Sequence, residues 1–245
     1  MKLCVIFDMD GVIIDSEPIH MVCEKEIFRM LEISVTDEEH HSLTGTTDTH
    51  MWTHFKGSFN LVQSVNELVD LKQTFYIECL KSKVNLRPVS YIPELISILH
   101  KNGFLLALAS SSPHAQIDFV LNEFNLRNYF HAVVSGDDVK YGKPNPGIFL
   151  KASELVGVPP QCCVVIEDSN KGVLAAKKAN MHCIGYRNPN SGNQDLSIAD
   201  IVIDDFRKLT IEMIKTLISL DLSLSNFDEI ELSKYTSTSG FDSQK

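Results

Sequence analysis

The sequence lacks several features that would place it in a membrane, in the secretory pathway or among zinc proteins. No apolar stretch has the length that a membrane span requires. The first apolar run is too short for the core of a secretion signal, and no small-residue cleavage site follows it. The six cysteines show no zinc-ligand spacing, and no internal repeat is evident. We therefore expect a cytoplasmic protein whose cysteines act mainly as small buried hydrophobic residues.

Basic side chains are also scarce. The chain of 245 residues has 22 Lys and Arg against 32 Asp and Glu, which gives a formal net charge of −10. This balance disfavours nucleic acid and anionic membrane surfaces as partners. An anionic metabolite stays compatible with it, because a bound divalent cation can reverse the local field. We expect a monomer or weak dimer.

Alternating strands and helices predict the fold. Leu3–Phe7 is an unbroken apolar run, typical of a strand buried on both faces. From Pro88 onward, apolar strands alternate with amphipathic helices, which indicates a parallel sheet with helices on both faces. We predict an α/β fold, a Rossmann-like core of residues 1–15 and 84–220, with a helical cap inserted at 16–83 and a polar, partly disordered tail at 221–245.

Some polar residues have a simpler structural interpretation. Ser112, followed by Pro113, is expected to cap the next helix, and Ser169 is expected to cap another. The pair His40-His41 is expected on an exposed, acidic helix face. Trp52 is expected in the core of the helical insertion.

Polar side chains stand at or just beyond the ends of four predicted strands. They are Asp8 with Asp10, Ser110, Lys143 in Gly142-Lys143-Pro144, and Glu167 with Asp168. The carboxyl ends of parallel strands meet at one edge of a sheet, so these groups should lie close together. Several carboxylates suit Mg²⁺, whereas an ammonium and a hydroxyl suit the oxygens of a phosphoryl group.

With these motifs in this order, the sequence resembles the haloacid dehalogenase superfamily, whose members are mostly phosphatases. Within it, the chain is similar to the β-phosphoglucomutases and small sugar-phosphate phosphatases, which have a helical cap after the first strand. The matching segments are Asp8-Met9-Asp10-Gly11-Val12, Ser110, Lys143 and Glu167-Asp168.

The resemblance implies a role for each of these residues. Asp8 is the nucleophile that forms an aspartyl-phosphate, and Asp10 is the acid and base that serves the leaving oxygen and the attacking water. The phosphate is held by Ser110, Ser111 and Lys143. Mg²⁺ is held by Asp8, by the backbone carbonyl of Asp10, and by Asp168, with Glu167 in support.

The helical cap is where the sequence departs from the β-phosphoglucomutase pattern. In those enzymes the cap loop carries a Lys just before its glycine and an Arg four residues after that Lys. Here these positions are Thr44 and Asp48. A mutase must anchor a second phosphate, which Asp48 would repel. The residues expected to contact substrate from the cap are Thr44, Gly45, Thr46, Thr47, Asp48, Lys72 and His20.

Three functions follow, in order of preference. The first is a Mg²⁺-dependent phosphatase acting on a small phosphomonoester, such as a sugar or polyol phosphate. The second is a phosphosugar mutase of the β-phosphoglucomutase type. The third is a non-catalytic binding or regulatory module, which would not need both Asp8 and Asp10. Dehalogenation is disfavoured because superfamily dehalogenases lack an acid at the position of Asp10.

Overall fold

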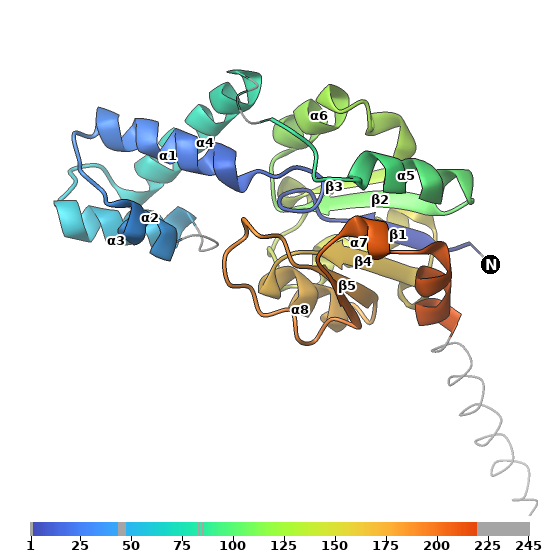
Figure 1. The fold of residues 1–245 in the computed structure, drawn as a ribbon. Helices are drawn as coiled ribbons and strands as arrows, with labels where there is room; N and C mark the ends of the chain where they lie inside the picture. The colour runs from blue at the N-terminus through green and yellow to red at the C-terminus, as the bar shows by residue number, and fades with distance from the viewer. Residues whose placement is uncertain (1, 44–47, 83, 85, 220–245) are drawn as a thin grey trace, which may run out of the picture.

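A six-stranded parallel sheet forms the centre of the molecule (Figure 1). The computed structural model describes residues 2–43, 48–82, 84 and 86–219. The predicted tail at 221–245 and four cap-loop residues, Thr44 to Thr47, lie outside the described residues. The strands, in the spatial order β3-β2-β1-β4-β5-β6, are β1 Cys4–Phe7, β2 Leu105–Ser110, β3 Ala132–Ser135, β4 Cys163–Glu167, β5 His182–Tyr186 and β6 Ile201–Ile203. The predicted Rossmann-like α/β fold is confirmed.

The two faces of the sheet are covered by separate hydrophobic clusters. Along β1, Val5 and Phe7 belong to one cluster and Cys4 and Ile6 to the other, as the alternation of side chains along a strand requires. The first cluster includes residues of α5 Ile92–Lys101, α6 His114–Glu123 and a helix at 211–219. The second includes residues of α7 Gly147–Val156 and α8 Asn170–Lys178. Short 3₁₀ helices complete this part at η1 Arg127–Tyr129, η2 Gly136–Asp138, η3 Pro160–Cys162 and η4 Phe206–Lys208.

Four helices follow β1 and lie to one side of the sheet (Figure 1). They are α1 Glu17–Met30, α2 Asp37–Ser42, α3 Asp48–Phe59 and α4 Val65–Ser82. They share a hydrophobic cluster of their own, in which Trp52 and Phe55 are fully buried. The prediction that Trp52 is a core residue is confirmed. These helices are called the cap below, and its boundaries at residues 16 and 83 stay a prediction.

Two connections join the cap to the sheet, and they run together. Ile14 forms an isolated antiparallel bridge with Pro88. Arg87 Nη2 donates to Oδ2 of Asp15 at 3.0 Å, and Asn190 donates to both oxygens of the same carboxylate. Because ion pairs and backbone pairing hold both connections at one place, the cap is anchored directly beside the end of β1.

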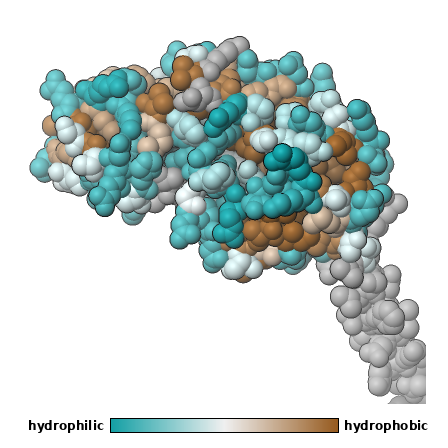
Figure 2. All heavy atoms as spheres, in the orientation of Figure 1, coloured by the Kyte–Doolittle hydropathy of each residue, from teal (hydrophilic) through white to brown (hydrophobic). Residues whose placement is uncertain are grey.

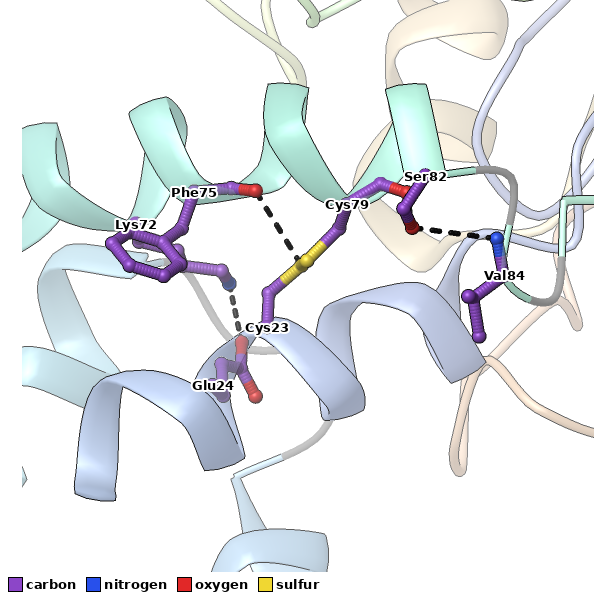
Figure 3. The surroundings of a disulfide bond; sticks show 7 residues. All are labelled: Cys23, Glu24, Lys72, Phe75, Cys79, Ser82 and Val84. Atoms are coloured by element: carbon purple, nitrogen blue, oxygen red, sulfur yellow. Dashed lines mark hydrogen bonds and ion pairs between the residues drawn. A yellow bond between two sulfur atoms is a disulfide. The ribbon is translucent and has the colours of Figure 1, made fainter. Parts of the chain in front are cut away.

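Cys23 and Cys79 join α1 to α4 in a disulfide bond (Figure 3). Their Cα atoms are 6.4 Å apart, within the range that a disulfide spans. The sequence pattern gave no partner for either residue. The other four cysteines are free and buried, as predicted.

Ser169 fulfils a local prediction from the sequence, whereas Ser112 and His40 do not. Ser169 caps α8, and its side chain accepts from the backbone N–H of Gly172. Gly103 follows the end of α5 with a φ of +80°, where glycine is favoured. Ser112 does not cap α6, because its hydroxyl donates to Asp10 instead. His40 is not exposed, because its ring packs edge-to-face against Phe28 and is paired with Glu24.

Hydrophilic side chains cover most of the visible face, with separate apolar areas between them (Figure 2). The exposed large apolar side chains are spread over many elements, among them Met30 and Val62 in the cap and Tyr141 and Leu155 elsewhere. Within the described residues, no helix combines the length and hydrophobicity that a membrane span needs.

Candidate active site

The end of β1 places the first two carboxylates at the centre of the sheet edge. β1 lies between β2 and β4. Strands β2 and β3 are added on one side of β1 and strands β4 to β6 on the other, which makes this a topological switch point, where α/β sheets bind ligands. Asp8 directly follows the strand. Gly11 turns the chain with a φ of +77°, and a Cβ atom there would lie 1.9 Å from Oδ2 of Asp168. Only glycine therefore lets this turn pack closely against the acidic residues after β4.

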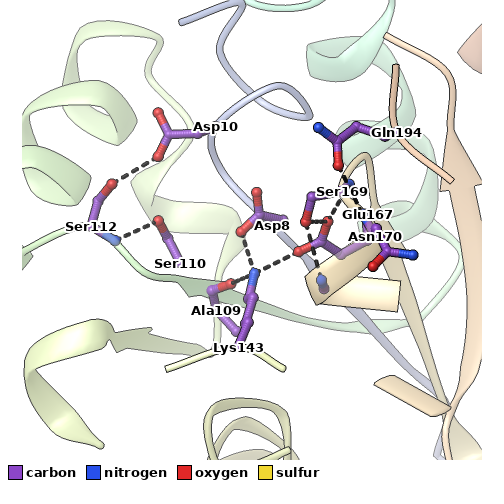
Figure 4. A network of polar contacts seen from close by, with 11 residues as sticks. Asp8, Asp10, Ala109, Ser110, Ser112, Lys143, Glu167, Ser169, Asn170 and Gln194 are labelled. Carbon is purple, nitrogen blue, oxygen red and sulfur yellow. Dashed lines mark hydrogen bonds and ion pairs between the residues drawn. The ribbon is translucent and has the colours of Figure 1, made fainter. Parts of the chain in front are cut away.

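Lys143 links Asp8, which follows β1, to Glu167, the last residue of β4 (Figure 4). Its Nζ donates to Oδ1 of Asp8 at 2.6 Å and to Oε1 of Glu167 at 2.7 Å. A third bond goes to the backbone oxygen of Ala109 at 3.2 Å. These three hydrogen bonds fix the ammonium group of Lys143 beside Asp8.

Glu167 and Asp168 are fixed by the loops around them. Oε2 of Glu167 accepts from the backbone N–H and the hydroxyl of Ser169, at 2.8 and 2.9 Å. A Cβ atom on Gly172 would lie 1.8 Å from Oε1 of Glu167, so the first turn of α8 presses directly on this carboxylate. Asp168 accepts from the hydroxyl of Ser191. Both acids are therefore oriented by contacts within the protein.

The donor set fits a hard divalent cation. Single carboxylate oxygens of Asp8, Glu167 and Asp168 lie within 4.8 Å of one another, and all three residues are buried. Three buried carboxylates face one ammonium, so negative charge is in excess, and oxygen-only donors suit Mg²⁺. The carboxylate of Asp10 is not part of this group.

Burial and repulsion between the carboxylates raise the pKa values of two acids in this group. Burial raises the pKa of the Asp8 carboxyl to about 7, against the opposing charge of Lys143. Burial and then the charge of Glu167 raise the pKa of Asp168 well above its ordinary value. For Lys143, burial acts to lower the pKa, but the charges of Asp8 and Glu167 outweigh it and the pKa is raised. A cation among these acids would favour their ionised forms.

Asp10 is held apart from the other carboxylates (Figure 4). The hydroxyl of Ser112 donates to its Oδ2 at 2.7 Å. The backbone N–H of the same serine donates to Oγ of Ser110 at 3.0 Å, which orients that hydroxyl at the end of β2. Asp10 therefore has its own partner, Ser112, which also fixes the hydroxyl of Ser110.

A cavity of about 310 Å³ opens over these groups. Its lining brings together Asp8, Asp10, Ser110, Ser111, Lys143, Glu167 and Asp168, which are all the core residues predicted from the sequence. The cap adds Glu17 and His20 to the wall. Burial raises the pKa of Glu17 to about 7.

A second hollow of about 170 Å³ lies beside the first and is lined by both the cap and the loop after β2. His20, Asp48 and Lys72, which the sequence predicts to contact substrate, line this hollow. Lys72, however, is buried and paired with Glu24 and Asp48, so its charge is balanced inside the cap. Among the predicted cap contacts, Thr44, Gly45, Thr46 and Thr47 lie outside the described residues.

Three residues around the site were missed from the sequence. Ser191 binds Asp168, Ser112 binds Asp10, and Tyr76 lines the second hollow. Ser191 and Tyr76 have no local signal, because each reaches the site only through the tertiary fold. Ser112 lies two residues after Ser110, the serine of the family motif, so its position in the same loop could have suggested a role in the site.

The chain has a parallel α/β sheet with acids and a lysine at the edge formed by the carboxyl ends of its strands, where enzymes of this architecture bind their ligands. The sequence model described as haloacid dehalogenase-like hydrolase matches residues 5–186. The chain belongs to this family, as its motifs predicted.

Known relatives show which members of the family the chain is similar to. The chain is 32% identical over 213 residues to hexitol phosphatase B of Escherichia coli, which covers 85% of this chain and 94% of that protein. It is 31% identical over 218 residues to β-phosphoglucomutase of Bacillus subtilis, with coverage of 86% and 92%. The crystal structure of CbbY from Rhodobacter sphaeroides with phosphate superposes with a TM-score of 0.72 at 24% identity, covering 85% of this chain and 96% of that one.

Proposed function

We propose that this protein is a Mg²⁺-dependent phosphatase that hydrolyses a small phosphomonoester through an aspartyl-phosphate on Asp8. The arrangement around Asp8 carries the proposal. One oxygen of its carboxylate is held by Lys143, while Asp10, two residues on, has a separate partner in Ser112. Two neighbouring acids in different environments suit two different roles, nucleophile and acid/base.

In the first step, an oxygen of Asp8 attacks phosphorus and the bond to the leaving oxygen breaks. Asp10 gives its proton to that oxygen, so a neutral alcohol leaves. In the second step, Asp10 takes a proton from water, which attacks the aspartyl-phosphate and releases inorganic phosphate. Lys143 and Ser110 bind the phosphoryl oxygens, on which negative charge is spread.

Asp8, the backbone carbonyl of Asp10, and Asp168 would hold Mg²⁺, with Glu167 in support. The ion neutralises charge between the nucleophile and the phosphoryl oxygens when it is bound. Serine hydroxyls hold Glu167 and Asp168 in place, and Gly11 lets the turn after β1 pack against Asp168.

The charge balance around Lys72 supports a phosphatase over a mutase. The second hollow has to accept the part of the substrate beyond its phosphate, and a mutase would need a free cation there for a second phosphate. Lys72 is already neutralised by Glu24 and Asp48. We infer a substrate whose tail is neutral and rich in hydroxyls, a sugar or polyol phosphate. The similarity to hexitol phosphatase B supports the same class.

Other expectations stay predictions. These are the cytoplasmic location, a monomer or weak dimer, and the absence of nucleic-acid and membrane partners. The domain boundaries and the roles of Thr44 to Thr47 also remain to be tested.

The deciding experiment is phosphate release from a panel of phosphorylated sugars, polyols and other small metabolites, with Mg²⁺. We expect turnover of at least one hexitol or hexose phosphate, its loss with EDTA and its recovery with excess Mg²⁺. The variant Asp8→Asn should lower turnover by about 10⁴-fold or more.

Two other outcomes would support one of the alternative functions instead. Conversion of β-glucose 1-phosphate to glucose 6-phosphate faster than phosphate release, in the presence of the hexose bisphosphate, would establish a mutase. Binding without turnover across the whole panel would establish a non-catalytic module. Full activity of Asp8→Asn would contradict the mechanism itself.

A further inference from the structure

Three buried polar atoms beside the proposed acid/base lack a hydrogen-bond partner. Within the part of the chain that the structure describes, they are Oδ1 of Asp10, Nδ1 of His20 and the hydroxyl oxygen of Tyr76. Burying a polar atom without a partner costs free energy, so such atoms are rare unless they serve a function. All three atoms belong to residues that line the two hollows.

The atoms belong to groups that meet where the cap faces the sheet edge. The rings of His20 and Tyr76 are stacked, with centroids 4.1 Å apart and planes within 8° of each other. His20 lines both hollows, Asp10 lines the first and Tyr76 lines the second. Tyr76 is only 3% exposed, and α4, which carries it, is tied to α1 by the Cys23–Cys79 disulfide. The disulfide therefore fixes α4, which carries the phenol, against α1, which carries His20.

Between the phenol and Asp10, the phenol is the donor, because an ionised carboxylate can only accept a hydrogen bond. Burial, and after it the charge of Asp10, raise the pKa of Tyr76 well above its ordinary value. Ser16, a second polar neighbour of the phenol, acts in the opposite direction and lowers the pKa. A phenol that keeps its proton beside a carboxylate is a hydrogen-bond donor to that carboxylate.

We propose that Tyr76 is a positioning residue for Asp10, with its hydroxyl donating to Oδ1 from the cap while Ser112 donates to Oδ2 from the loop after β2. One hydrogen bond then satisfies two of the unpartnered atoms. The inference rests on the proposed function, since it concerns how the acid/base is aimed. It also gives the cap a part in the chemistry, because α4 carries one of the two groups that orient Asp10.

The test compares leaving groups in the full-length enzyme. The variant Tyr76→Phe removes only the hydroxyl. We expect kcat/KM for a hexitol phosphate, whose leaving alkoxide needs a proton, to fall about 10-fold. We expect kcat/KM for 4-nitrophenyl phosphate, whose leaving group needs none, to stay near the wild-type value.

Ser112→Ala should show the same dependence on the leaving group, because it releases the other oxygen of Asp10. The matched control is Tyr129→Phe, remote from the site, which should leave both values unchanged. Equal losses for both esters in Tyr76→Phe, or no loss for either, would overturn the inference.

A measurement without turnover separates this inference from the proposed function. The melting temperatures of Tyr76→Phe, Asp10→Ala and the double variant should be non-additive, with the double variant shifted by less than the sum of the single shifts. Non-additive shifts in an inactive protein would contradict the proposed function and retain the contact. Additive shifts would overturn the contact.

Discussion

Two buried lysines, one at the sheet edge and one in the cap, each lie between two carboxylates. Lys143 contacts Asp8 and Glu167, and Lys72 contacts Glu24 and Asp48. At the sheet edge a third acid, Asp168, faces the same point, so negative charge is in excess. In the cap, the extra neighbour is His40, which pairs with Glu24.

The difference lies in what each lysine leaves available. The excess charge at the sheet edge can hold a divalent cation, and Lys143 can then turn toward phosphoryl oxygens. In the cap, the charge of Lys72 is offset by two carboxylates of the protein, and the hollow beside them suits neutral hydroxyl groups. Under the proposed function, the same local arrangement would serve chemistry in one region and shape a substrate pocket in the other.

The largest expected effect comes from removing the lysine at the sheet edge. Lys143→Met should lower kcat by about 10²- to 10³-fold, because a preorganised charge on the phosphoryl group is lost. Steady-state kinetics with saturating Mg²⁺ measures this. A kcat near the wild-type value would show that Lys143 only balances charge, as Lys72 does.

Removing the lysine of the cap should affect stability more than the chemical step. In Lys72→Met, Glu24 and Asp48 lose a buried partner, and the free energy of unfolding should fall by about 3 kcal/mol in urea titrations. We expect KM to change more than kcat. The control is Lys25→Met, which breaks an exposed pair with Asp37 and should cost less than about 1 kcal/mol. Equal losses in both variants would contradict the buried network.

The close packing of the turn after β1 can be tested with two glycines of similar backbone conformation. Gly11 and Gly103 have φ values of +77° and +80°, but a Cβ atom would collide with Asp168 only at Gly11 and meets nothing within 4 Å at Gly103. Gly11→Ala should cost about 2 kcal/mol and weaken Mg²⁺ binding. Gly103→Ala should cost about 1 kcal/mol and leave Mg²⁺ binding unchanged. Calorimetric titration with Mg²⁺ distinguishes them, and equal affinities would argue against a cation at Asp168.

The smallest effect concerns helix caps in the two regions. Ser169 and Ser64 each accept from a backbone N–H at the start of a helix, α8 and α4. Replacing either by alanine should cost about 1 kcal/mol. Only Ser169→Ala should also lower kcat, since its hydroxyl holds Glu167. A similar loss of kcat in Ser64→Ala would show that activity follows stability alone.

The two regions also differ in how far the sequence predicts them. Each acid at the sheet edge directly follows a buried strand, so local pattern and parallel topology were enough to bring Asp8 and Asp168 together. Pairing in the cap depends on how helices pack over long separations. Glu24 meets His40 across 16 residues and Lys72 meets Asp48 across 24. The segment Asp37–Ser42 is polar throughout, so nothing in it marked His40 as buried.

The most direct test of the account is to identify the residue that carries phosphate during turnover. Enzyme mixed with Mg²⁺ and its best substrate is quenched in acid within one turnover, and its peptides are analysed by mass spectrometry. We predict one phosphoryl group on the peptide that contains Asp8, at the Asp8 side chain, and none in Asp8→Asn. Phosphate on another residue, or turnover by the Asp8→Asn variant, would contradict the account.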